Sequence, residues 1–571
     1  MAREEHVTIA NLQASGVLEL LDVELARALG AMSSTPDLQV DLAIALTSRN
    51  VRRGHACLPL DMAASDLAST TGEVGLELPE HGSWANALLE SELVDHGPLV
   101  LDEKHRLYLR RYFELEHDIA RELATRSTPN SLEEDHTWLA EALDRLFGDD
   151  PKSQHRRAAR NAMDHRVSVL CGGPGTGKTT TVAAIVALLV EGRLREVGRA
   201  PKVMLLAPTG KAAVRLGEAV TRAKKTIHAA DEVLASIPGE AITVHRALGM
   251  QRHGMRFSRG ADSPVDADII VLDEASMIDL GLMRQLLVAA PVNATILIVG
   301  DPDQLTSVEA GSVLRDLVRA SNETWWRHRI THLTKTYRYD EAQPLGQLVA
   351  AIRDGNPSVI DELLDSHGSG DVQWSSLGDI GDELDRAAVK WSEIVNATEA
   401  EEHFRRRAQY VVLSPYRKGP IGTRQLGVAI ERRTPRVGLA VHPIIIEENN
   451  SEIGVYNGDF GMLFERDGTL GATVQCAPGR IENLAEARLP RYSSAYALSV
   501  HKAQGSEFDE VLIVMPEEDA PLLTRELLYT AVSRARARVR LVGPREVIAA
   551  AVRRPARRFS GLVDRIAALA P

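Results

Sequence analysis

The chain is poor in cysteine, in aromatic residues and in long apolar runs, and each shortage excludes a class of protein. Its 3 cysteines are scattered among 571 residues, so we expect neither a disulfide framework nor a zinc site. No segment approaches the roughly 18 consecutive apolar residues that a transmembrane helix requires. The first residues, MAREEHVTIA, lack the apolar stretch of a secretory signal. The expected location is therefore the cytoplasm.

A positive net charge is also missing. The formal net charge is −13, whereas a protein that binds nucleic acid over its whole surface is usually basic. Any nucleic-acid site must then be a local basic track, or must belong to an assembly that supplies more positive surface. Only 11 of the 66 basic residues are lysine, so a lysine at a motif position is informative. With 4% aromatic residues, we expect a bound strand to be held mainly by its backbone.

The patterns along the chain predict an α/β protein with several domains. Apolar residues recur at three- and four-residue spacing over 1–125, which predicts an N-terminal helical docking domain. From about residue 150, short apolar runs alternate with amphipathic helices, as in parallel sheets with helices on both faces. We expect two such domains, 126–355 and 356–571. Glycine-punctuated sequence predicts a hairpin insertion near 251–264 and a small β-barrel-like insertion at about 427–495.

A glycine-rich loop lies between an apolar strand, VSVLC, and a helix, TTTVAAIVALLVEG. In this context backbone N–H groups curl around phosphates at the positive end of the helix. Lys178 is expected to reach the β- and γ-phosphates, and Thr179 to bind Mg²⁺. The loop therefore predicts a site for ATP and Mg²⁺. Its residues are Gly172, Gly173, Pro174, Gly175, Thr176, Gly177, Lys178, Thr179 and Thr180.

Further polar side chains follow apolar runs and complete a hydrolytic site. Asp273 is placed to hold the hydration shell of Mg²⁺, and Glu274 to orient and deprotonate the attacking water. Gln304 follows the next apolar run and can bind the γ-phosphate or the water. Arg338 and Arg534 are candidates for the cations that phosphoryl transfer requires. Taken singly, each of these residues is more often an ordinary cap, loop or ion-pair residue, and only their combination favours catalysis.

The order of the motifs resembles that of superfamily 1B helicases, and most of all the RecD family of exodeoxyribonuclease V (RecBCD) subunits. The resemblance covers about 150–545, and the segments GHACLPL and PLVLDEKHRLYLRRYFELE extend it to the helical front end. The motifs that carry it are GGPGTGKTTTV, APTGKAAVRL, TVHRALG, IIVLDEASM, GDPDQL, LTKTYR, VLSPYRKGPIG, YNGDFG, ALSVHKAQGSEFD and LLYTAVSRARARV.

This resemblance implies two RecA-like motor domains with ATP at their interface and single-stranded DNA crossing both, moved 5′→3′. It implies work on double-stranded DNA ends in a heterotrimer with RecB-like helicase-nuclease and RecC-like subunits. Gln154 matches the glutamine that binds adenine, Tyr337 the aromatic residue against the base, and Gln504 a coupling position followed by Gly505. The positions that match DNA contacts are Pro208, Thr209, Lys211, His245, Asn457, His501 and Lys502.

Three positions depart from the family pattern. No tryptophan precedes Gln154, Gly427 stands where an asparagine is common, and Ser533 replaces a threonine. None of the three belongs to the predicted catalytic set. The basic clusters at 155–160, 404–407 and 552–558 are interpreted as solvated faces or partner contacts.

Other functions remain open at the level of sequence. A stand-alone RecD-like helicase usually carries a longer front extension, and a subunit without turnover would not need the intact Lys178, Glu274 and Arg534. A metal nuclease would need a Glu-x-Lys or Asp-x-Lys near another acid. The chain has no Glu-x-Lys, and Asp-x-Lys occurs only at 102–104 and 150–152. We therefore expect DNA cleavage to belong to a partner chain.

Overall fold

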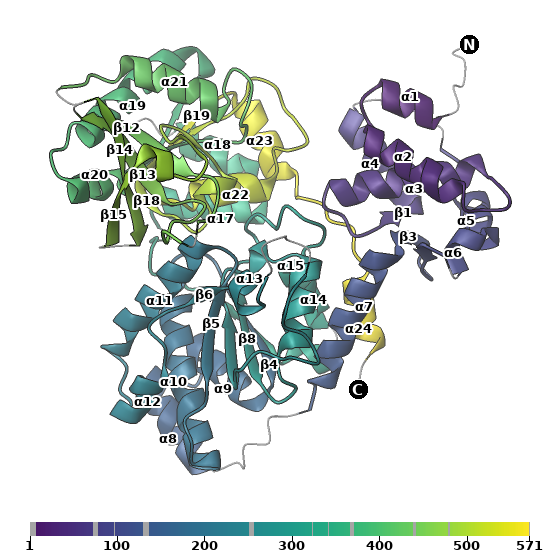
Figure 1. The fold of residues 1–571 in the computed structure, drawn as a ribbon, viewed down its shortest axis with the longest axis horizontal. Coiled ribbons are helices and arrows are strands. Elements are labelled where there is room, and N and C mark those ends of the chain that lie inside the picture. The colour runs from purple at the N-terminus through teal and green to yellow at the C-terminus, as the bar shows by residue number, and fades with distance from the viewer. Residues whose placement is uncertain are drawn as a thin grey trace.

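The computed structural model divides into an N-terminal helical domain and two larger bodies built on parallel sheets (Figure 1). The N-terminal domain stands beside the two larger bodies, which lie one above the other in this view and which we call the first and second motor domains after the expectation from the sequence. The residues that the structure describes are 7–71, 78–95, 97–128, 136–250, 256–322, 324–340, 342–365, 370–437, 441–450, 452–466, 468–477 and 480–569.

The N-terminal domain is mainly helical and has its own core, in which Leu46, Leu67 and Trp84 are buried. It also contains a small antiparallel sheet in the order β1-β3-β2. The sequence predicted no strands here, because each is too short for a period of two residues to be recognised. Its elements are α1 (Ile9–Ala14), α2 (Leu20–Gly30), α3 (Leu38–Arg52), β1 (Leu58–Pro59), α4 (Ala63–Thr71), α5 (His81–Glu90), α6 (Glu92–Asp95), β2 (Leu99–Leu101), β3 (Arg106–Leu109) and α7 (Arg110–Thr125).

The first motor domain is built on a six-stranded parallel sheet in the order β6-β5-β7-β8-β4-β9. Its strands are β4 (Val167–Gly172), β5 (Val203–Ala207), β6 (Ile242–Thr243), β7 (Ile269–Leu272), β8 (Thr295–Gly300) and β9 (Ile330–Leu333). Its helices are α8 (His136–Phe147), α9 (Gln154–Asp164), α10 (Lys178–Val197), α11 (Gly210–Lys224), α12 (Asp231–Ser236), α13 (Val244–Ala247), α14 (Leu280–Ala289), α15 (Val313–Arg319) and α16 (Thr324–Arg327).

Helices cover both faces of this sheet, as Figure 1 shows, and the strand residues alternate between two apolar cores. In β7, Ile269 and Val271 pack with α8 to α12, whereas Ile270 and Leu272 pack with α7, α14 and α15. Successive side chains of a strand point to opposite faces. Because both faces are buried, these strands appear in the sequence as continuous apolar runs.

The second motor domain holds a five-stranded parallel sheet in the order β10-β19-β18-β11-β17. Its strands are β10 (Val372–Ser375), β11 (Tyr410–Ser414), β17 (Leu498–Ser499), β18 (Phe508–Val514) and β19 (Ala535–Val542). The helices of this part of the chain are α17 (Pro344–Asp354), α18 (Pro357–Asp365), α19 (Ile380–Val395), α20 (Ala400–Arg407), α21 (Thr423–Arg433), α22 (Arg525–Val532) and α23 (Arg545–Arg553).

The insertion in the second motor domain is an antiparallel sheet in the order β15-β14-β13-β12-β16. Its strands are β12 (Val441–Ile446), β13 (Phe460–Arg466), β14 (Thr469–Ala477), β15 (Arg480–Ala485) and β16 (Tyr492–Ser494). The predicted start near 427 lies inside α21, so the insertion begins later. Among the described residues no pairing joins β15 to β16, so the sheet is open where the sequence predicted a barrel-like form.

Three segments pack away from the domain to which the sequence assigned them, and the first is α7, whose Ile119, Ala120 and Leu123 are buried in the core of the first motor domain. Helix α17 lies before the predicted boundary at 355, yet Leu348 and Ile352 are buried in the core of the second motor domain. The last helix, α24 (Leu562–Ala568), lies beside α7 on the flank of the first motor domain (Figure 1). We call residues 555–569 the C-terminal strap, because they leave the second motor domain and cross to the other two.

Hydrogen bonds fasten this strap to the N-terminal domain and to α7. The Ala56 N–H donates to the Phe559 carbonyl at 2.8 Å, and the Phe559 N–H donates to His55 Nδ1 at 2.9 Å. The Gly561 N–H donates to both carboxylate oxygens of the buried Glu116 at 3.1 Å. The strap therefore ties the end of the chain to its beginning.

In two of the basic clusters, one arginine contacts carbonyls of the protein although the cluster was expected to face solvent or a partner. Arg407 is buried, donates to the Tyr410 carbonyl at 2.7 Å and has its guanidinium 4.9 Å from the ring centre of Phe460. Arg558 donates to the Arg53 carbonyl at 3.0 Å and to the Ser307 carbonyl at 3.1 Å. Sequence alone could not separate Arg407 and Arg558 from their exposed neighbours, because any guanidinium can bind carbonyls that only the fold brings to it.

The predicted hairpin at 251–264 is only partly testable, because residues 251–255 lie outside the described residues. The flanking residues Met250 and Phe257 form an antiparallel bridge, and Gly260 and Ser263 form another. Among the helices that the structure describes, none has the length and apolar character needed to cross a membrane.

The strap predicts a pH dependence of folding through His55. Burial lowers the pKa of His55 to about 3 from its ordinary value of 6.5, because the ring is enclosed and Nδ1 must remain an acceptor. The stabilising effect of the neutral ring is complete above pH 6.5 and is lost as the pH falls from 6.5 towards 3. We expect His55→Gln to remove about 1 to 2 kcal/mol of the decrease in unfolding free energy between pH 7 and pH 5.

Urea unfolding at both pH values measures this effect, and His228→Gln, at an exposed position, is the control. An equal pH dependence in wild type and His55→Gln would contradict the assignment.

Candidate functional site

The glycine-rich loop connects the end of β4 to the first residue of α10, Lys178. Gly175 and Gly177 have φ angles of +75° and +79°, a region that favours glycine. A Cβ built on Gly175 would lie 2.2 Å from Cβ of Arg338, so a side chain there would collide with the segment after β9. The loop thus needs glycine for both its conformation and its close packing, and it leaves the N-terminus of α10 open to an anion.

Lys178 lies within the curl of this loop. Its Nζ donates to the carbonyls of Gly172 at 2.6 Å and Gly173 at 2.9 Å. The Thr176 hydroxyl also donates to the Gly173 carbonyl, at 2.9 Å. Thr179, half-buried, and Thr180, exposed, follow in the first turn of α10. The predicted phosphate-binding residues are therefore together, with the ammonium group held at the mouth of the loop.

Asp273 and Glu274 follow β7, at the same carboxyl edge of the sheet as the loop. The Glu274 N–H donates to the Asp273 carboxylate at 2.9 Å. Burial and the Glu274 charge raise the pKa of Asp273 to about 6, while Lys178 acts in the opposite direction. Glu274 has a φ of 51°, a left-handed conformation that costs a non-glycine residue about 1–2 kcal/mol. The strained residue is thus the one that the sequence predicts to deprotonate the attacking water.

Gln304 lies in the loop after β8 and is buried. Its Nε2 donates to Asp301 Oδ2 at 2.9 Å, and the Tyr529 hydroxyl donates to the same oxygen at 3.2 Å. Asp301 is 1% exposed, so both bonds satisfy a carboxylate that is shielded from water. Tyr529 belongs to α22 of the second motor domain, so this contact joins the two domains.

Two more hydrogen bonds cross between the domains beside Gln304. The Leu305 N–H donates to Thr530 Oγ1 at 2.9 Å, and Gln504 Nε2 donates to the Leu305 carbonyl at 3.2 Å. Both main-chain groups of Leu305 therefore have partners in the second motor domain. Tyr529 and Thr530 lie within the motif LLYTAVSRARARV, but the sequence alone predicts no role for them, because their contacts depend on this pairing across domains.

The two candidate arginines are placed differently. The Cβ of Arg338 lies close to Gly175. Its guanidinium contacts Glu507 and the Ser533 carbonyl, the latter at 3.4 Å. Arg534 is buried and donates to the Thr530 carbonyl at 3.0 Å and to the Ser506 carbonyl at 3.3 Å. Arg338 therefore begins at the phosphate loop, whereas Arg534 is anchored within the second motor domain.

The residues of the predicted adenine site lie beside the glycine-rich loop, near Gly175 and Gly177. Gln154 at the start of α9 exchanges hydrogen bonds with Thr334: its Oε1 accepts the Thr334 N–H at 2.8 Å, and its Nε2 donates to Thr334 Oγ1 at 3.0 Å. The Tyr337 N–H donates to the Gly175 carbonyl at 2.7 Å, while its ring is 63% exposed. An exposed ring beside the loop is suited to stacking on a base. His155, which the sequence analysis did not assign, has its ring 6.2 Å from that of Tyr337.

The predicted DNA contacts fall into two groups. Thr209 caps α11 by accepting the Ala212 N–H at 3.2 Å, and Tyr456 of the insertion packs on Gly210. A groove of about 690 Å³ lies between α11, the segment 239–246 and the insertion. Pro208 is half-buried and directly precedes Thr209 in the chain. His245, on α13, has its ring 6.3 Å from that of Phe257.

Lys211 lies on α11, which lines this groove, and faces charges from both motor domains. Burial, Arg215 and Arg407 lower the pKa of Lys211 to about 7, while Asp459 opposes them. Asn457 is exposed on the turn before β13, where its N–H donates to Asn449 Oδ1 at 2.8 Å.

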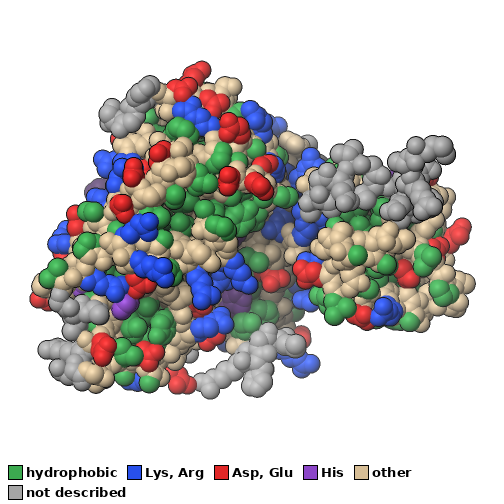
Figure 2. Space-filling view, turned by 90° about the horizontal axis from the view of Figure 1, so that it is seen from above, with side chains coloured by type: hydrophobic (Ala, Val, Ile, Leu, Met, Phe, Trp, Pro, Cys, Tyr) green, Lys and Arg blue, Asp and Glu red, His purple; other side chains and the backbone are tan. Residues whose placement is uncertain are grey.

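The second group follows β17 in the second motor domain. His501 and Lys502 lie in a 3-10 turn after β17, and Lys502 Nζ donates to Glu447 Oε1 at 2.6 Å. In Figure 2, Lys and Arg side chains are interspersed with Asp and Glu, and they gather beside the hollow between the N-terminal domain and the motor domains. Local basic surface is thus present on an acidic chain.

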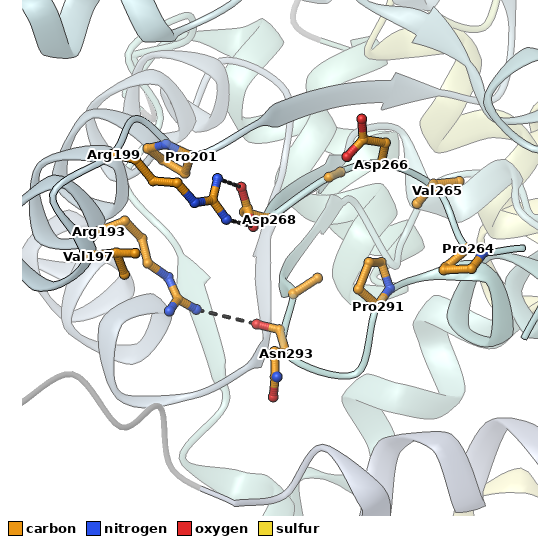
Figure 3. Close-up of a pocket in the computed structure, with 12 residues that line it drawn as sticks. Arg193, Val197, Arg199, Pro201, Pro264, Val265, Asp266, Asp268, Pro291 and Asn293 are labelled. Carbon is orange, nitrogen blue, oxygen red and sulfur yellow. Dashed lines mark hydrogen bonds and ion pairs between the residues drawn. The ribbon is translucent and has the colours of Figure 1, made fainter.

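A different pocket, shown in Figure 3, does not belong to this site. It has a volume of about 500 Å³ and is lined by residues that precede β5, β7 and β8, among them Arg199 and Asp268, which pair at 3.2 Å. Ligands of parallel sheets bind beyond the carboxyl ends of the strands. This pocket lies at the amino ends, opposite the phosphate loop.

The two Asp-x-Lys segments have structural roles. Asp102 accepts the main-chain N–H of Lys104 at 3.0 Å and pairs with Arg106, while Lys104 Nζ pairs with Asp564 of the strap at 2.6 Å. The Asp150 carboxylate accepts the Lys152 N–H at 2.9 Å in an exposed turn. Neither arrangement presents a metal-binding group of acids.

Two parallel-sheet domains, with a phosphate loop on one and polar contacts from the other, define a motor ATPase of the helicase class. Residues 155–310 match the family described as AAA domain, residues 494–542 the UvrD-like helicase C-terminal domain, and residues 14–108 the RecBCD enzyme subunit RecD, N-terminal domain. The chain is 35% identical to the RecBCD enzyme subunit RecD of Mycobacterium tuberculosis, covering 97% of this chain and 95% of that protein. It belongs to the RecD family.

Two further comparisons are with proteins named as helicases. It is 36% identical to the ATP-dependent RecD2 DNA helicase of Deinococcus radiodurans over 71% of this chain and 51% of that protein. Among solved structures, the Pif1 helicase from Candida albicans aligns with a TM-score of 0.40 at 14% identity, covering 73% of this chain and 99% of that chain.

The position of Lys178 in the loop predicts the effect of its removal. We expect Lys178→Gln to lower ATP hydrolysis at least about a hundredfold, because the variant loses a cation beside the transferred phosphate. Steady-state phosphate release measures this loss. Lys202→Gln, which removes an exposed lysine paired with Asp266, should retain wild-type turnover. Hydrolysis by Lys178→Gln at the wild-type rate would refute the role of this lysine.

Proposed function

We propose that this chain is an ATP-dependent 5′→3′ DNA helicase, the motor subunit of a RecBCD-type complex that processes double-strand ends in repair and recombination. The observation that carries the proposal is the set of hydrogen bonds between the loop carrying Gln304 and α22 of the second motor domain. They would connect the proposed hydrolysis site to a movement of the second motor domain. The motor would work on single-stranded DNA with RecB-like and RecC-like partners, and its location would be the cytoplasm.

The hydrolytic roles follow from the positions of the side chains. Lys178 would bind the β- and γ-phosphates, and Glu274 would take the proton of the attacking water. The Thr179 hydroxyl at the start of α10 and the Asp273 carboxylate at the same sheet edge fit the oxygen ligands that Mg²⁺ requires. Bound there with ATP, Mg²⁺ would neutralise phosphate charge. Arg338 and Arg534 would stabilise the charge that develops during transfer.

The coupling of hydrolysis to movement would run through Gln304 and Leu305. Gln304 shares Asp301 with Tyr529, so a new bond from its amide to phosphate or water would leave Tyr529 as the remaining side-chain donor to that oxygen and change the environment of a contact between the domains. Such a local change can shift the balance between two domain arrangements. The groove beside Thr209 and Lys211 and the cluster at His501 and Lys502 would hold the strand on the two domains that move.

Two alternatives are less well supported. A stand-alone helicase is the first, but the likeness to RecBCD subunits extends over 95% of the relative, against 51% for the RecD2 helicase. A subunit without turnover is the second. The arrangement of Lys178, Asp273 and Glu274 at one sheet edge supports an active site instead.

The direction of movement gives the functional test. The full chain should displace a strand from duplexes with a 5′ single-stranded tail and not from duplexes with a 3′ tail, in the presence of ATP and Mg²⁺. The Lys178→Gln chain provides the background for each substrate. Equal displacement from both tails would overturn the polarity, and no displacement from either would favour the subunit without turnover.

The surface of the N-terminal domain predicts where partners dock. Leu20 and Leu21 of α2 are each 65% exposed and Leu38 of α3 is 85% exposed, beside a groove of about 1010 Å³ lined by Leu38, Leu42 and Leu78. Apolar surface of this kind marks interaction sites. We expect Leu38→Asp to reduce co-purification of RecB-like and RecC-like chains about tenfold or more, whereas Val292→Asp, at an exposed valine of the first motor domain, should not.

Quantitative affinity purification from the native cell measures the ratio of partners to this chain. Unchanged recovery with Leu38→Asp would exclude this surface as the docking site.

A further inference from the structure

One carboxylate at the domain interface lies among four arginines, and no role has been given to it. Glu507 precedes β18, and its two oxygens accept hydrogen bonds from Arg338 Nη2 and, at 3.3 Å, from Arg536 Nε. Arg215 of α11 and Arg534 are close enough to lower the pKa of Glu507 together with Arg338. Arg215 and Arg338 come from the first motor domain, so Glu507 is a meeting point of the two domains.

The Cβ of Arg338 lies against the glycine-rich loop of the first motor domain, whereas its guanidinium lies against the second motor domain. The preceding N–H, of Tyr337, donates to the Gly175 carbonyl at 2.7 Å, and a Cβ on Gly175 would lie 2.2 Å from Cβ of Arg338. The side chain therefore starts at the phosphate loop. Its guanidinium, however, is bound to Glu507 and to the Ser533 carbonyl. Rotation about side-chain bonds alone would carry the charged end between the two places.

A phosphate and a carboxylate compete for such a guanidinium. Arginine binds both through charge-assisted hydrogen bonds, and bidentate pairing with phosphate is among the strongest. The side chains of Arg338 and Glu507 are 17% and 27% exposed. A partly buried arginine that loses its anion is costly unless another anion replaces it. The pair with Glu507 therefore opposes transfer of Arg338 to the nucleotide.

The segment that carries Glu507 also carries predicted DNA contacts. His501 and Lys502 lie in the 3-10 turn five or six residues earlier, and Gly505, with a φ of +66°, forms the bend between them and Glu507. A displacement of this turn by a bound strand would act on Glu507 through very few rotatable residues. This places a DNA contact and a partner of Arg338 on one short segment.

We propose that Glu507 is a positioning residue that holds Arg338 on the second motor domain, and that nucleotide phosphate must displace Glu507 to engage Arg338. This rests on the proposed ATP hydrolysis. DNA bound at His501 and Lys502 weakens the hold, which makes turnover depend on DNA. Glu507 thus suppresses hydrolysis when no strand is bound.

Glu507→Gln tests the proposal, because it removes the charge and keeps the shape. ATP hydrolysis without DNA should rise about fivefold or more, the KM for ATP should fall, and the stimulation by single-stranded DNA should decrease by the same factor. Glu507→Asp keeps the charge on a shorter side chain and should give an intermediate ratio. Glu510→Gln is the matched control: Glu510 lies three residues later and pairs with Arg538 at 3.3 Å.

The outcomes separate this inference from the function on which it rests. No hydrolysis by the wild-type chain with DNA would defeat the proposed function itself. Wild-type hydrolysis with an unchanged stimulation ratio in every folded Glu507 variant would overturn only the role of Glu507. A rise in KM for ATP in Glu507→Gln would also overturn it, because Glu507 would then contact the nucleotide directly. If Glu507→Gln does not fold, judged by its thermal melt, the ratio for Glu507→Asp decides.

Discussion

The hydrogen bonds made by the loop after β8 bind the two motor domains to each other at a buried carboxylate. Asp301 is almost fully buried; one of its oxygens accepts the Asp303 N–H, and the other accepts hydrogen bonds from Gln304 of its own domain and Tyr529 of the other. The Leu305 N–H donates a hydrogen bond to the second domain, and the Leu305 carbonyl accepts one from it. An unsatisfied buried carboxylate costs several kcal/mol. The loop therefore cannot change its contacts within one domain without changing those with the other.

This constraint explains why so much polar chemistry gathers at one edge of the first sheet. In a parallel sheet, all carboxyl ends share an edge, so the loops after β4, β7 and β8 meet although they are distant in the chain. Glycine lets the loop after β4 turn tightly, and Glu274, in the loop after β7, has a strained left-handed backbone conformation. Arginines from both domains then surround the same edge, with Glu507 between them. A site of this kind is complete only when the two domains are in contact.

Much of the site was predictable because its chemistry depends on local patterns. The glycine-rich loop, the acids after β7 and Gln304 each follow an apolar run, and buried parallel strands produce such runs. Glu507 and Tyr529 could not be found in this way, because their roles come from partners more than 150 residues away in the sequence. The roles of the site residues that were expected from the sequence, such as Lys178, Glu274 and Gln304, remain predictions.

The fold shows the same division between local and distant information. The two sheets were expected from alternating strands and helices, and the helical front end from its period. The short strands β1 to β3, the open form of the inserted sheet and the position of α17 were not. These depend on which surfaces meet, and an amphipathic helix between two domains has the same period whichever core it joins. The strap was missed because its basic residues resemble those of a solvated tail.

The strap extends the coupling of the motor domains to the N-terminal domain. Arg558 bridges the Arg53 carbonyl of the N-terminal domain and the Ser307 carbonyl, two residues after Leu305. The Gly311 N–H donates to the Gly54 carbonyl at 2.9 Å. The loop after β8 is thus bonded at one end to α22 and at the other to the domain with the exposed apolar surface. Because these hydrogen bonds join the N-terminal domain directly to the loop after β8, a displacement of either one changes contacts of the other.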